Sequence, residues 1–468
     1  MNWDTVIAGG TVVSAEGKQR ADVAIRGERI VAVAKGLARQ ASPATRIVDV
    51  AGRYVLPGAI DMHVHLDLAV CDTVTSDNFD SGTRAAARGG VTTIIDFATP
   101  YGDDTLHDAF DNWIRKADGV SHIDYGFHMC LTRGERHLRQ VPEMVRLGIP
   151  TFKQFMIYAR EGWQSDDGQI FGALEMMRQV GGTLLVHAES CAVLDLLVAR
   201  QHHPAAMKRH GVLLHAMTRP SFIEAEAIQR AIKWAEVTGG RLYIVHMSTG
   251  EGADLVRHAR RRGIDVWSET CPQYLVLDES VFRGKDGHLY ATSPQVKTEA
   301  DGLRLWQGLR RGEVAVVSTD TCSFTRAQKD RWGGDWTKLP NGMPGLETMV
   351  PLIYTRGVLA ARLTLRQLVA ACCTNPARLM GLYPRKGVIQ PGSDADLAII
   401  HPTHKIKVDW RKMETHCDWN PYQGWSLAGF AEHTFSRGRQ LVENYRFIGQ
   451  GCGGQYLPRE PVAPRLQT

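Results

Sequence analysis

The sequence predicts an α/β protein in which a (β/α)8 barrel carries a small β-sandwich domain formed by both ends of the chain. Two observations lead to this fold class. Between about residue 54 and residue 320, eight short apolar segments alternate with longer stretches of helical character, as expected for a parallel barrel. Before and after this region, short β-rich runs are joined by turn residues and show no helical period.

The eight predicted barrel strands are nearly continuous apolar runs, which suits a parallel sheet covered on both faces. They span residues 54–61, 91–97, 123–129, 148–155, 183–187, 241–246, 264–269 and 314–320. Helical segments are predicted over residues 76–88, 142–147, 221–236 and 250–262. Ser221 and Glu224 have the spacing of a capping box at the start of the third of these helices.

The changes in pattern also predict the domain boundaries. Residues 1–56 form the N-terminal part of the β-sandwich, with Arg26, Gly27 and Glu28 at a hairpin tip. Residues 57–382 form the barrel, and residues 383–455 form the C-terminal part of the sandwich. The proline-rich residues 456–468 are expected to form an extended arm.

Composition limits the classes of function. The chain has 468 residues, of which 44% are hydrophobic and 22% are charged, as in ordinary folded proteins. Its net charge is only +5 and it has no long run of like charges, so neither nucleic acid nor an anionic membrane is an expected partner. No signal pattern or membrane-length apolar stretch appears. The nine cysteines are scattered, without a C-x-x-C pair, which predicts reduced thiols and a cytoplasmic location.

Six residues with metal-binding chemistry lie at the ends of predicted strands. Two residues apart on a strand, His63 and His65 point to the same face. The active sites of such barrels lie where the carboxyl ends of the strands converge. Taken alone, a histidine in such an apolar run is expected to be a hydrogen-bonded core residue, and Asp320 is expected to cap the N-terminus of the segment that follows it. Together they predict a metal centre made by His63, His65, Lys153, His187, His246 and Asp320.

Lys153 is the unusual member of this set, because a protonated lysine repels a cation. Burial lowers the pKa of a lysine, and the neutral amine can then add carbon dioxide. The resulting N6-carboxylysine is an anion with two oxygens. We therefore expect carboxylated Lys153 to bridge two metal ions.

Several longer stretches carry a family resemblance. They include L-P-G-A-I-D-M-H-V-H-L-D (56–67), T-F-K-Q-F-M-I-Y (151–158), L-V-H-A-E-S (185–190), I-V-H-M-S-T-G-E-G-A (244–253), E-T-C-P-Q-Y-L (269–275) and N-G-M-P-G-L-E (341–347). With these motifs the chain resembles the hydantoinase and dihydropyrimidinase branch of the amidohydrolase superfamily. The likeness extends from the first strands to about Ile400.

The resemblance implies a binuclear centre with two divalent ions, zinc being the best fit to the ligands. His63, His65 and Asp320 would bind one ion, and His187 and His246 the other. A metal-held hydroxide would attack the ring carbonyl of a hydantoin or dihydropyrimidine, with Asp320 as general base and then acid. The product would be an N-carbamoyl amino acid, and the enzyme a homodimer or homotetramer.

The resemblance also assigns the residues that hold the substrate. Tyr158 matches the tyrosine that stabilises the oxyanion, and Ser293 and Asn341 match positions whose backbone groups hold the ring amide. An apolar pocket for the substituent outside the ring is expected from Ala69, Val70, Phe155 and Trp163.

Three departures from the family pattern bear on the substrate. Thr321 follows Asp320 where the family usually has histidine, Ala159-Arg160 follows the tyrosine motif where a lysine is frequent, and Gln295, Val296 and Lys297 replace a usual proline and arginine. Hydrolysis of another cyclic amide, imide or ureide, as in an allantoinase or a dihydroorotase, therefore remains an alternative. A mononuclear deaminase is disfavoured by Lys153, and a non-catalytic adaptor relative by the complete ligand set.

Overall fold

Eight parallel strands form a closed barrel in the computed structural model, which describes residues 1–462. In order around the sheet they are β8 (Ala59–Val64), β11 (Val91–Ala98), β12 (Asp124–Cys130), β13 (Thr151–Phe155), β14 (Thr183–His187), β15 (Arg241–Ile244), β16 (Val266–Thr270) and β17 (Val316–Val317). The barrel closes where the backbone N–H of His65 donates to the Thr321 carbonyl at 2.8 Å. The predicted fold class is confirmed.

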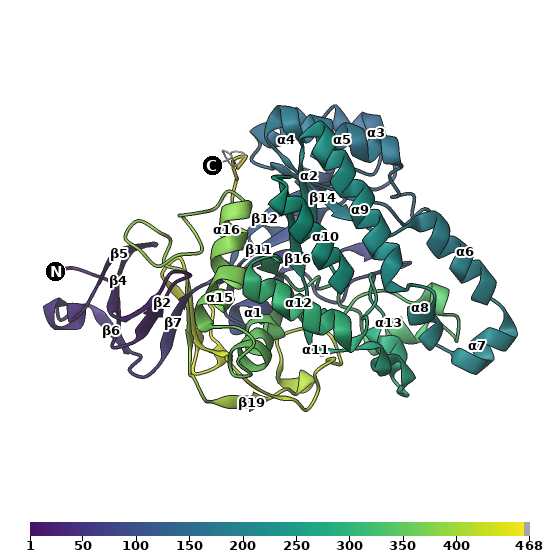
Figure 1. Ribbon diagram of the computed structural model, residues 1–468. Coiled ribbons are helices and arrows are strands. Elements are labelled where there is room, and N and C mark those ends of the chain that lie inside the picture. The colour runs from purple at the N-terminus through teal and green to yellow at the C-terminus, as the bar shows by residue number, and fades with distance from the viewer. Residues whose placement is uncertain (463–468) are drawn as a thin grey trace.

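Helices surround the barrel (Figure 1). They are α1 (Phe79–Arg88), α2 (Leu106–Ala117), α4 (Val141–Arg146), α5 (Asp167–Val180), α9 (Ser221–Thr238), α10 (Gly250–Arg261) and α12 (Glu299–Arg311), followed after β17 by α14 (Met349–Leu352), α15 (Leu365–Val369) and α16 (Asn375–Leu379). Their apolar faces pack on the outside of the strands, and a second apolar cluster fills the barrel interior. No helix within residues 1–462 has the length and apolar character needed to cross a membrane.

Shorter elements extend over the carboxyl ends of the strands. They include the hairpin of β9 (Ala69–Val70) and β10 (Thr73–Val74), and the helices α3 (Gly134–Leu138), α6 (Cys191–Gln201), α7 (Pro204–His210), α8 (Leu213–Met217), α11 (Pro272–Val276) and α13 (Arg326–Asp330). We call this end of the barrel the rim, and the opposite end the floor.

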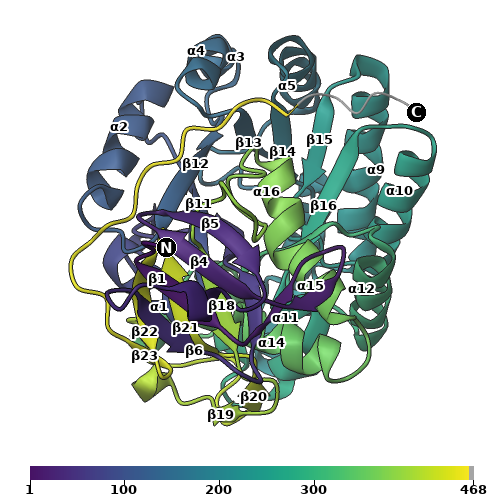
Figure 2. The ribbon, with the colours of Figure 1, turned by 90° about the vertical axis from the view of Figure 1, so that its left-hand side faces the viewer.

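The two ends of the chain build a β-sandwich beside the barrel (Figure 2). One sheet contains β5 (Arg29–Ala34), β4 (Asp22–Arg26), β1 (Thr5–Ala8) and β6 (Arg46–Asp49). The other contains β23 (Arg446–Phe447), β22 (Arg439–Glu443), β21 (Ala431–Ser436), β18 (Leu397–Ile400), β7 (Tyr54–Pro57), β2 (Thr11–Val13) and β3 (Lys18–Arg20). Because β18 pairs with both β7 and β21, the two termini share one sheet.

The predicted first barrel strand, 54–61, was wrong because the chain changes domain at Gly58. The backbone N–H of Gly58 donates to the carbonyl of Asp396 in the sandwich. The backbone N–H of the next residue, Ala59, donates to the carbonyl of Gly90 in the barrel. A Cβ at Gly58 would lie 2.0 Å from the Thr92 hydroxyl oxygen. Only glycine therefore allows β7 and β8 to follow each other so closely.

The predicted capping box at Ser221 and Glu224 was also wrong. Pro220 occupies the N-cap position of α9 and provides no side-chain cap. The Glu224 carboxylate instead accepts hydrogen bonds from the backbone N–H, at 2.8 Å, and the hydroxyl of Ser248. Glu224 thus fixes the loop that follows β15, a tertiary contact that sequence spacing does not reveal.

A buried ion cluster joins the barrel floor to the sandwich. The Nζ of Lys386 lies 2.5 Å from Asp124, 2.9 Å from Asp394 and 2.6 Å from Asp396. The guanidinium of Arg437 contacts Asp124 from another side, at 3.2 Å. These three aspartates could by spacing alone hold a metal ion, but the lysine ammonium already occupies their centre.

The described part of the C-terminal arm runs along the floor edges of β12 and β13 (Figure 2). Tyr125 and Leu457 are joined by a backbone hydrogen bond of 2.7 Å. Arg459 is buried and donates to the Thr151 hydroxyl at 2.8 Å. Residues 463–468 of the predicted arm lie outside the described part of the chain.

Candidate metal centre

The structure brings the six predicted ligand residues together at the rim. They come from the ends of five strands or from the residues that follow them: His63 and His65 (β8), Lys153 (β13), His187 (β14), His246 (β15) and Asp320 (after β17). All six line one cavity of about 490 Å³. The parallel strands therefore place these side chains as the sequence pattern predicts.

His63, His65 and Asp320 form the tightest part of this group. One carboxylate oxygen of Asp320 lies 3.2 Å from the Nε2 atoms of both histidines. Ligand atoms of the three residues lie within 4.8 Å of one another. Two imidazoles and a carboxylate at this spacing are suited to one divalent cation.

His187 and His246 form a second pair beside the first. Their ring centroids are 4.5 Å apart, and the His246 ring is 5.2 Å from that of His63. Burial lowers the pKa of both imidazoles, so they are neutral and able to ligate near pH 7. The Nδ1 atom of His246 is buried and has no hydrogen-bond partner among the described residues.

Lys153 lies beneath these side chains without a compensating anion. It is 1% exposed, and its Nζ lies 5.3 Å and 5.1 Å from the ring centroids of Phe97 and Phe155. Within residues 1–462, no carboxylate oxygen lies within ion-pair distance of it. Burial lowers the pKa of Lys153 to about 8, although Asp320 opposes the shift. A reactive, partly neutral amine is the chemical consequence.

Five residues that line the cavity have a left-handed backbone, and three of them are predicted site residues. The φ angles of His246, Asp320 and Tyr158 are 36°, 52° and 73°, in the left-handed region that L-residues seldom adopt. Such strain costs about 1–3 kcal/mol per residue and is concentrated at functional sites. At Asp320 the turn also ends the strand early, so the predicted strand 314–320 is regular only over Val316–Val317.

Buried carboxylates orient the histidines from outside the cavity. Glu269 hydrogen-bonds to His63 Nδ1 and accepts from the His246 backbone N–H at 3.1 Å. Glu189 contacts His187 Nε2 at 2.7 Å and the Arg219 guanidinium at 2.8 Å. These contacts select the ring nitrogens that face the cavity, as is usual around metal-binding histidines.

These two glutamates were not among the predicted site residues, although the sequence contains signals for both. Glu269 ends the predicted seventh strand, which had no assigned ligand. Glu189 follows His187 by two residues, the spacing that keeps side chains on one side of an extended segment.

Tyr158, Ser293 and Asn341 lie on the cavity wall. The Tyr158 ring is 5.2 Å from that of His187. Burial raises the pKa of Tyr158, and a hydrogen bond with Ser293 opposes the rise, so its hydroxyl remains a proton donor. The Asn341 side-chain oxygen is buried and has no partner among the described residues.

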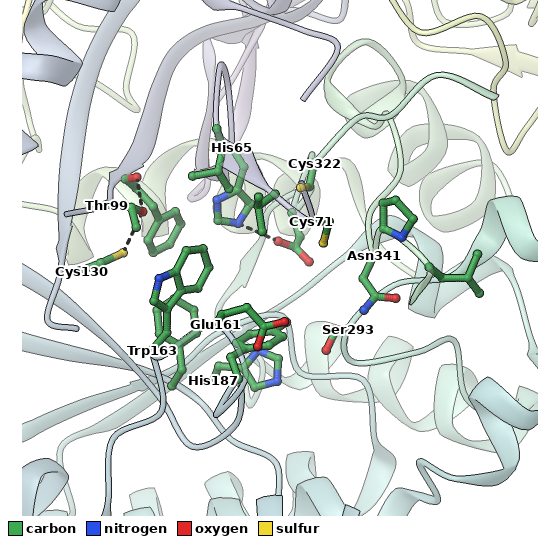
Figure 3. Close-up of a pocket in the computed structure, with 18 of the residues that line it drawn as sticks. His65, Cys71, Thr99, Cys130, Glu161, Trp163, His187, Ser293, Cys322 and Asn341 are labelled. Carbon is green, nitrogen blue, oxygen red and sulfur yellow. Dashed lines mark hydrogen bonds and ion pairs between the residues drawn. The ribbon is translucent and has the colours of Figure 1, made fainter. Parts of the chain in front are cut away.

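The cavity walls combine apolar and charged residues (Figure 3). Val70, Phe155 and Trp163 line it as predicted, joined by Leu68, whereas the exposed Ala69 is not part of the wall. Figure 3 shows Trp163 on one side and Ser293 and Asn341 on the other, with Glu161 between them. Glu161, together with Arg331 and Lys338, was not anticipated, because these side chains come from turns and a short 3-10 helix that have no periodic pattern.

The departures from the family pattern lie outside the wall of this cavity. Thr321 is buried in the barrel closure, where its hydroxyl accepts from the Gly345 N–H at 3.1 Å. Gln295 and Lys297 both donate to the Arg219 carbonyl, Lys297 at 2.8 Å. They therefore support the arginine that holds Glu189.

Comparison with known proteins agrees with this geometry. Residues 54–419 match the model of the amidohydrolase family. The chain is 37% identical to the D-hydantoinase of Geobacillus stearothermophilus over 97% of its own length and 96% of that protein, and 35% identical to a D-phenylhydantoinase of Escherichia coli over 98% and 99%. The crystal structure of dihydropyrimidinase from Brevibacillus agri NCHU1002 superposes with a TM-score of 0.94 at 36% identity, covering 98% of this chain and 99% of that one.

The chain therefore belongs to the amidohydrolase family, within its hydantoinase and dihydropyrimidinase group. This membership confirms the predicted class, a metal-dependent hydrolase that acts on cyclic amides. The donor set fits such a metal: four histidines, one aspartate and a lysine without an ion-pair partner face one cavity, and the Nδ1 atoms of His65 and His246 have no partner in the described chain.

Proposed function

We propose that this protein opens the ring of a 5-substituted hydantoin or a dihydropyrimidine and releases an N-carbamoyl amino acid. The observation that carries the proposal is the group of four imidazoles and one carboxylate around Lys153, a buried lysine without an ion-pair partner in the described chain. The names of the relatives support the substrate class, since they include D-hydantoinases and a dihydropyrimidinase.

Two divalent ions, most simply zinc, would occupy the centre. His63, His65 and Asp320 would hold one ion, and His187 and His246 the other. When bound, such a pair of ions supplies a hydroxide nucleophile near neutral pH and polarises the substrate carbonyl. The mixture of imidazole and carboxylate donors favours zinc over calcium or magnesium.

Carboxylation of Lys153 would complete the ligand set. The neutral amine would attack the carbon of carbon dioxide, so that a new N–C bond forms while one C–O π bond opens onto oxygen, and the nitrogen would lose its extra proton to water. The product is an anionic carbamate, which removes the cost of burying an unpaired cation. Its two oxygens allow one contact with each ion.

Asp320 and Tyr158 would serve the reaction itself. Asp320 accepts the proton of the attacking water and delivers it to the ring nitrogen as the C–N bond breaks. The Tyr158 hydroxyl donates to the oxygen that becomes negatively charged, a role supported by the rise in its pKa through burial. Ser293 and Asn341 hold the ring amide, and Leu68, Phe155 and Trp163 surround the substituent.

Hydrolysis of a panel of rings by metal-replete protein tests the proposal. We expect 5-phenylhydantoin or dihydrouracil to give the N-carbamoyl product, measured by liquid chromatography and mass spectrometry. Allantoin, dihydroorotate and simple cyclic imides are the competing substrates. Preferential turnover of one of these would establish the alternative ring, and turnover of none by protein containing two ions per chain would contradict the proposal.

Assembly and location complete the proposal. We infer a homodimer or homotetramer from the resemblance to the family, which light scattering can test. A cytoplasmic location is supported by nine free cysteines in the described chain, since such thiols persist in reducing compartments.

A further inference from the structure

Lys329 is another buried lysine at the rim, outside the metal centre. It lies in α13 and is completely buried. Its Nζ donates to two backbone carbonyls, those of Ala291 at 2.9 Å and Pro340 at 2.7 Å. Within the described chain no carboxylate lies at ion-pair distance, and the nearest ring, Phe324, is centred 5.8 Å away.

The two carbonyls belong to the segments that carry the proposed ring-binding residues. Ala291 precedes Ser293 by two residues, and Pro340 directly precedes Asn341. Ser293, Pro340 and Asn341 all line the metal cavity, and Figure 3 shows Ser293 and Asn341 on the same side of it. One amino group thus connects the backbones of two segments that are about fifty residues apart in the sequence.

The bonding of Lys329 differs from that of a lysine that only stabilises the fold. Lys386, equally buried, is matched by three aspartates. The titratable groups near Lys329 are the thiols of Cys71, Cys322 and Cys417 and the imidazole of His215, and burial lowers the pKa of Lys329 to about 7. Even the neutral amine carries two N–H groups, one for each carbonyl.

We propose that Lys329 is a positioning residue that sets the spacing between Ser293 and Asn341 and so fixes the site that receives the ring amide. This inference rests on the proposed function, because it assumes that these two residues contact the ring. The backbone N–H of Gly342 also donates to the Ala291 carbonyl, at 2.9 Å, so the segments stay adjacent without Lys329. Their relative placement, rather than their contact, is what Lys329 determines.

The test is Lys329→Met, which keeps the length and removes both donors. With 5-phenylhydantoin as substrate we expect KM to rise about tenfold and kcat to change less than about threefold, because misplacement of a binding group weakens binding before it alters the reacting groups. Metal content, measured by plasma emission spectrometry, should equal that of the wild type.

Lys386→Met is the matched control, since it removes a buried lysine far from the cavity. It should lower the thermal midpoint and leave KM unchanged. An unchanged KM in Lys329→Met, or an equal loss of metal and kcat, would overturn the inference. If the wild-type enzyme does not hydrolyse the hydantoin at all, the proposed function fails instead, so the two failures are distinguishable.

A second variant covers poor folding of the methionine form. Lys329→Ala leaves a cavity into which propylammonium can bind and restore the two hydrogen bonds. We expect added propylammonium chloride to lower the KM of this variant toward the wild-type value, with tetramethylammonium chloride, which has no N–H donor, as the salt control. Equal effects of the two salts would contradict the positioning role.

Discussion

Lys153 at the rim and Lys386 at the floor of the barrel are each at most 2% exposed, and their pKa values are shifted in opposite directions. At the floor, burial lowers the pKa of Lys386, but Asp396, Asp124 and Asp394 outweigh this effect and raise it. At the rim, burial prevails and lowers the pKa of Lys153 to about 8. The floor therefore holds a permanent ammonium group, while the rim holds an amine poised to react.

This difference shows where the fold stores unfavourable energy. The charges of the floor cluster compensate one another, and the cluster joins the barrel, the sandwich and Gln455, the residue that precedes the C-terminal arm. The rim combines an uncompensated lysine with left-handed backbone at His246 and Asp320. The stability of the remaining structure offsets the free-energy cost of backbone strain and of the unpaired charge at the rim.

The largest expected effect comes from removing the rim lysine. Lys153→Met should lower kcat/KM by at least about 10³-fold, because the proposed bridging anion, and with it the proposed binuclear centre, would be lost. We expect fewer than two ions per chain by plasma emission spectrometry. The thermal midpoint of the metal-free protein should not fall, since methionine removes a buried unpaired amine. Near-normal turnover would exclude the bridging role.

Removal of the floor lysine should give the opposite result. Lys386→Met leaves three buried carboxylates without their central cation, which costs about 3–5 kcal/mol of unfolding free energy. Urea unfolding followed by circular dichroism measures this loss, and kcat should remain close to that of the wild type. The exposed Lys338 offers a control, for which replacement by methionine should change stability by less than about 0.5 kcal/mol. A large loss of kcat in folded Lys386→Met would mean that the two ends are coupled.

Two tyrosines sharpen the same comparison. Tyr158→Phe removes the proposed oxyanion donor at the rim and should lower kcat about 10²–10³-fold, which corresponds to about 3–4 kcal/mol. KM and metal content should change little. Tyr456, whose hydroxyl donates to the Leu147 carbonyl at 3.2 Å on the floor side, is the matched control. Tyr456→Phe should leave kcat unaltered, and equal kinetics of both variants would remove Tyr158 from the mechanism.

Most of the fold could be predicted because the barrel has a strong local signal. Short apolar strands alternate with helices, and seven of the eight strands, β11 to β17, lie within or next to their predicted ranges. The misplaced boundary at Gly58 has a different origin, since both β7 and β8 are apolar and extended. They are separated only by the change of backbone hydrogen-bond partner, from Asp396 to Gly90. Hydrogen-bond partners that are far away in the sequence cannot be predicted from local hydrophobic periodicity.

The candidate site was predictable to the extent that it depends on strand ends. His63, Lys153, His187 and Asp320 follow from strand positions, because carboxyl ends of parallel strands converge. The charged wall residues Glu161 and Arg331 could not be predicted, since loops place them. Lys329 was missed for a similar reason: its short helix has no pattern to indicate that the lysine turns inward toward two carbonyls.

The smallest predicted effect concerns Glu224, a buried acid near the rim that has no direct ion pair in the described chain. Burial raises its pKa from 4.5 to about 7, although Lys297 opposes the rise. The folded state therefore binds more protons than the unfolded state between these values. The stability that this group contributes is complete below pH 4.5 and is lost as the pH rises toward 7.

Glu224→Gln cannot titrate, and its amide can still pair with Ser248. Relative to the wild type, this variant should gain stability between pH 4.5 and 7.5, up to about 3 kcal/mol from a shift of this size. Unfolding free energies of both proteins at several pH values give the difference directly. Glu414→Gln, which changes a partly exposed acid paired with Arg84, is the control and should show a much flatter profile. A constant difference between Glu224→Gln and the wild type would show that Glu224 is ionised in the folded protein throughout this range, and the rim would then resemble the floor in compensating its buried charge.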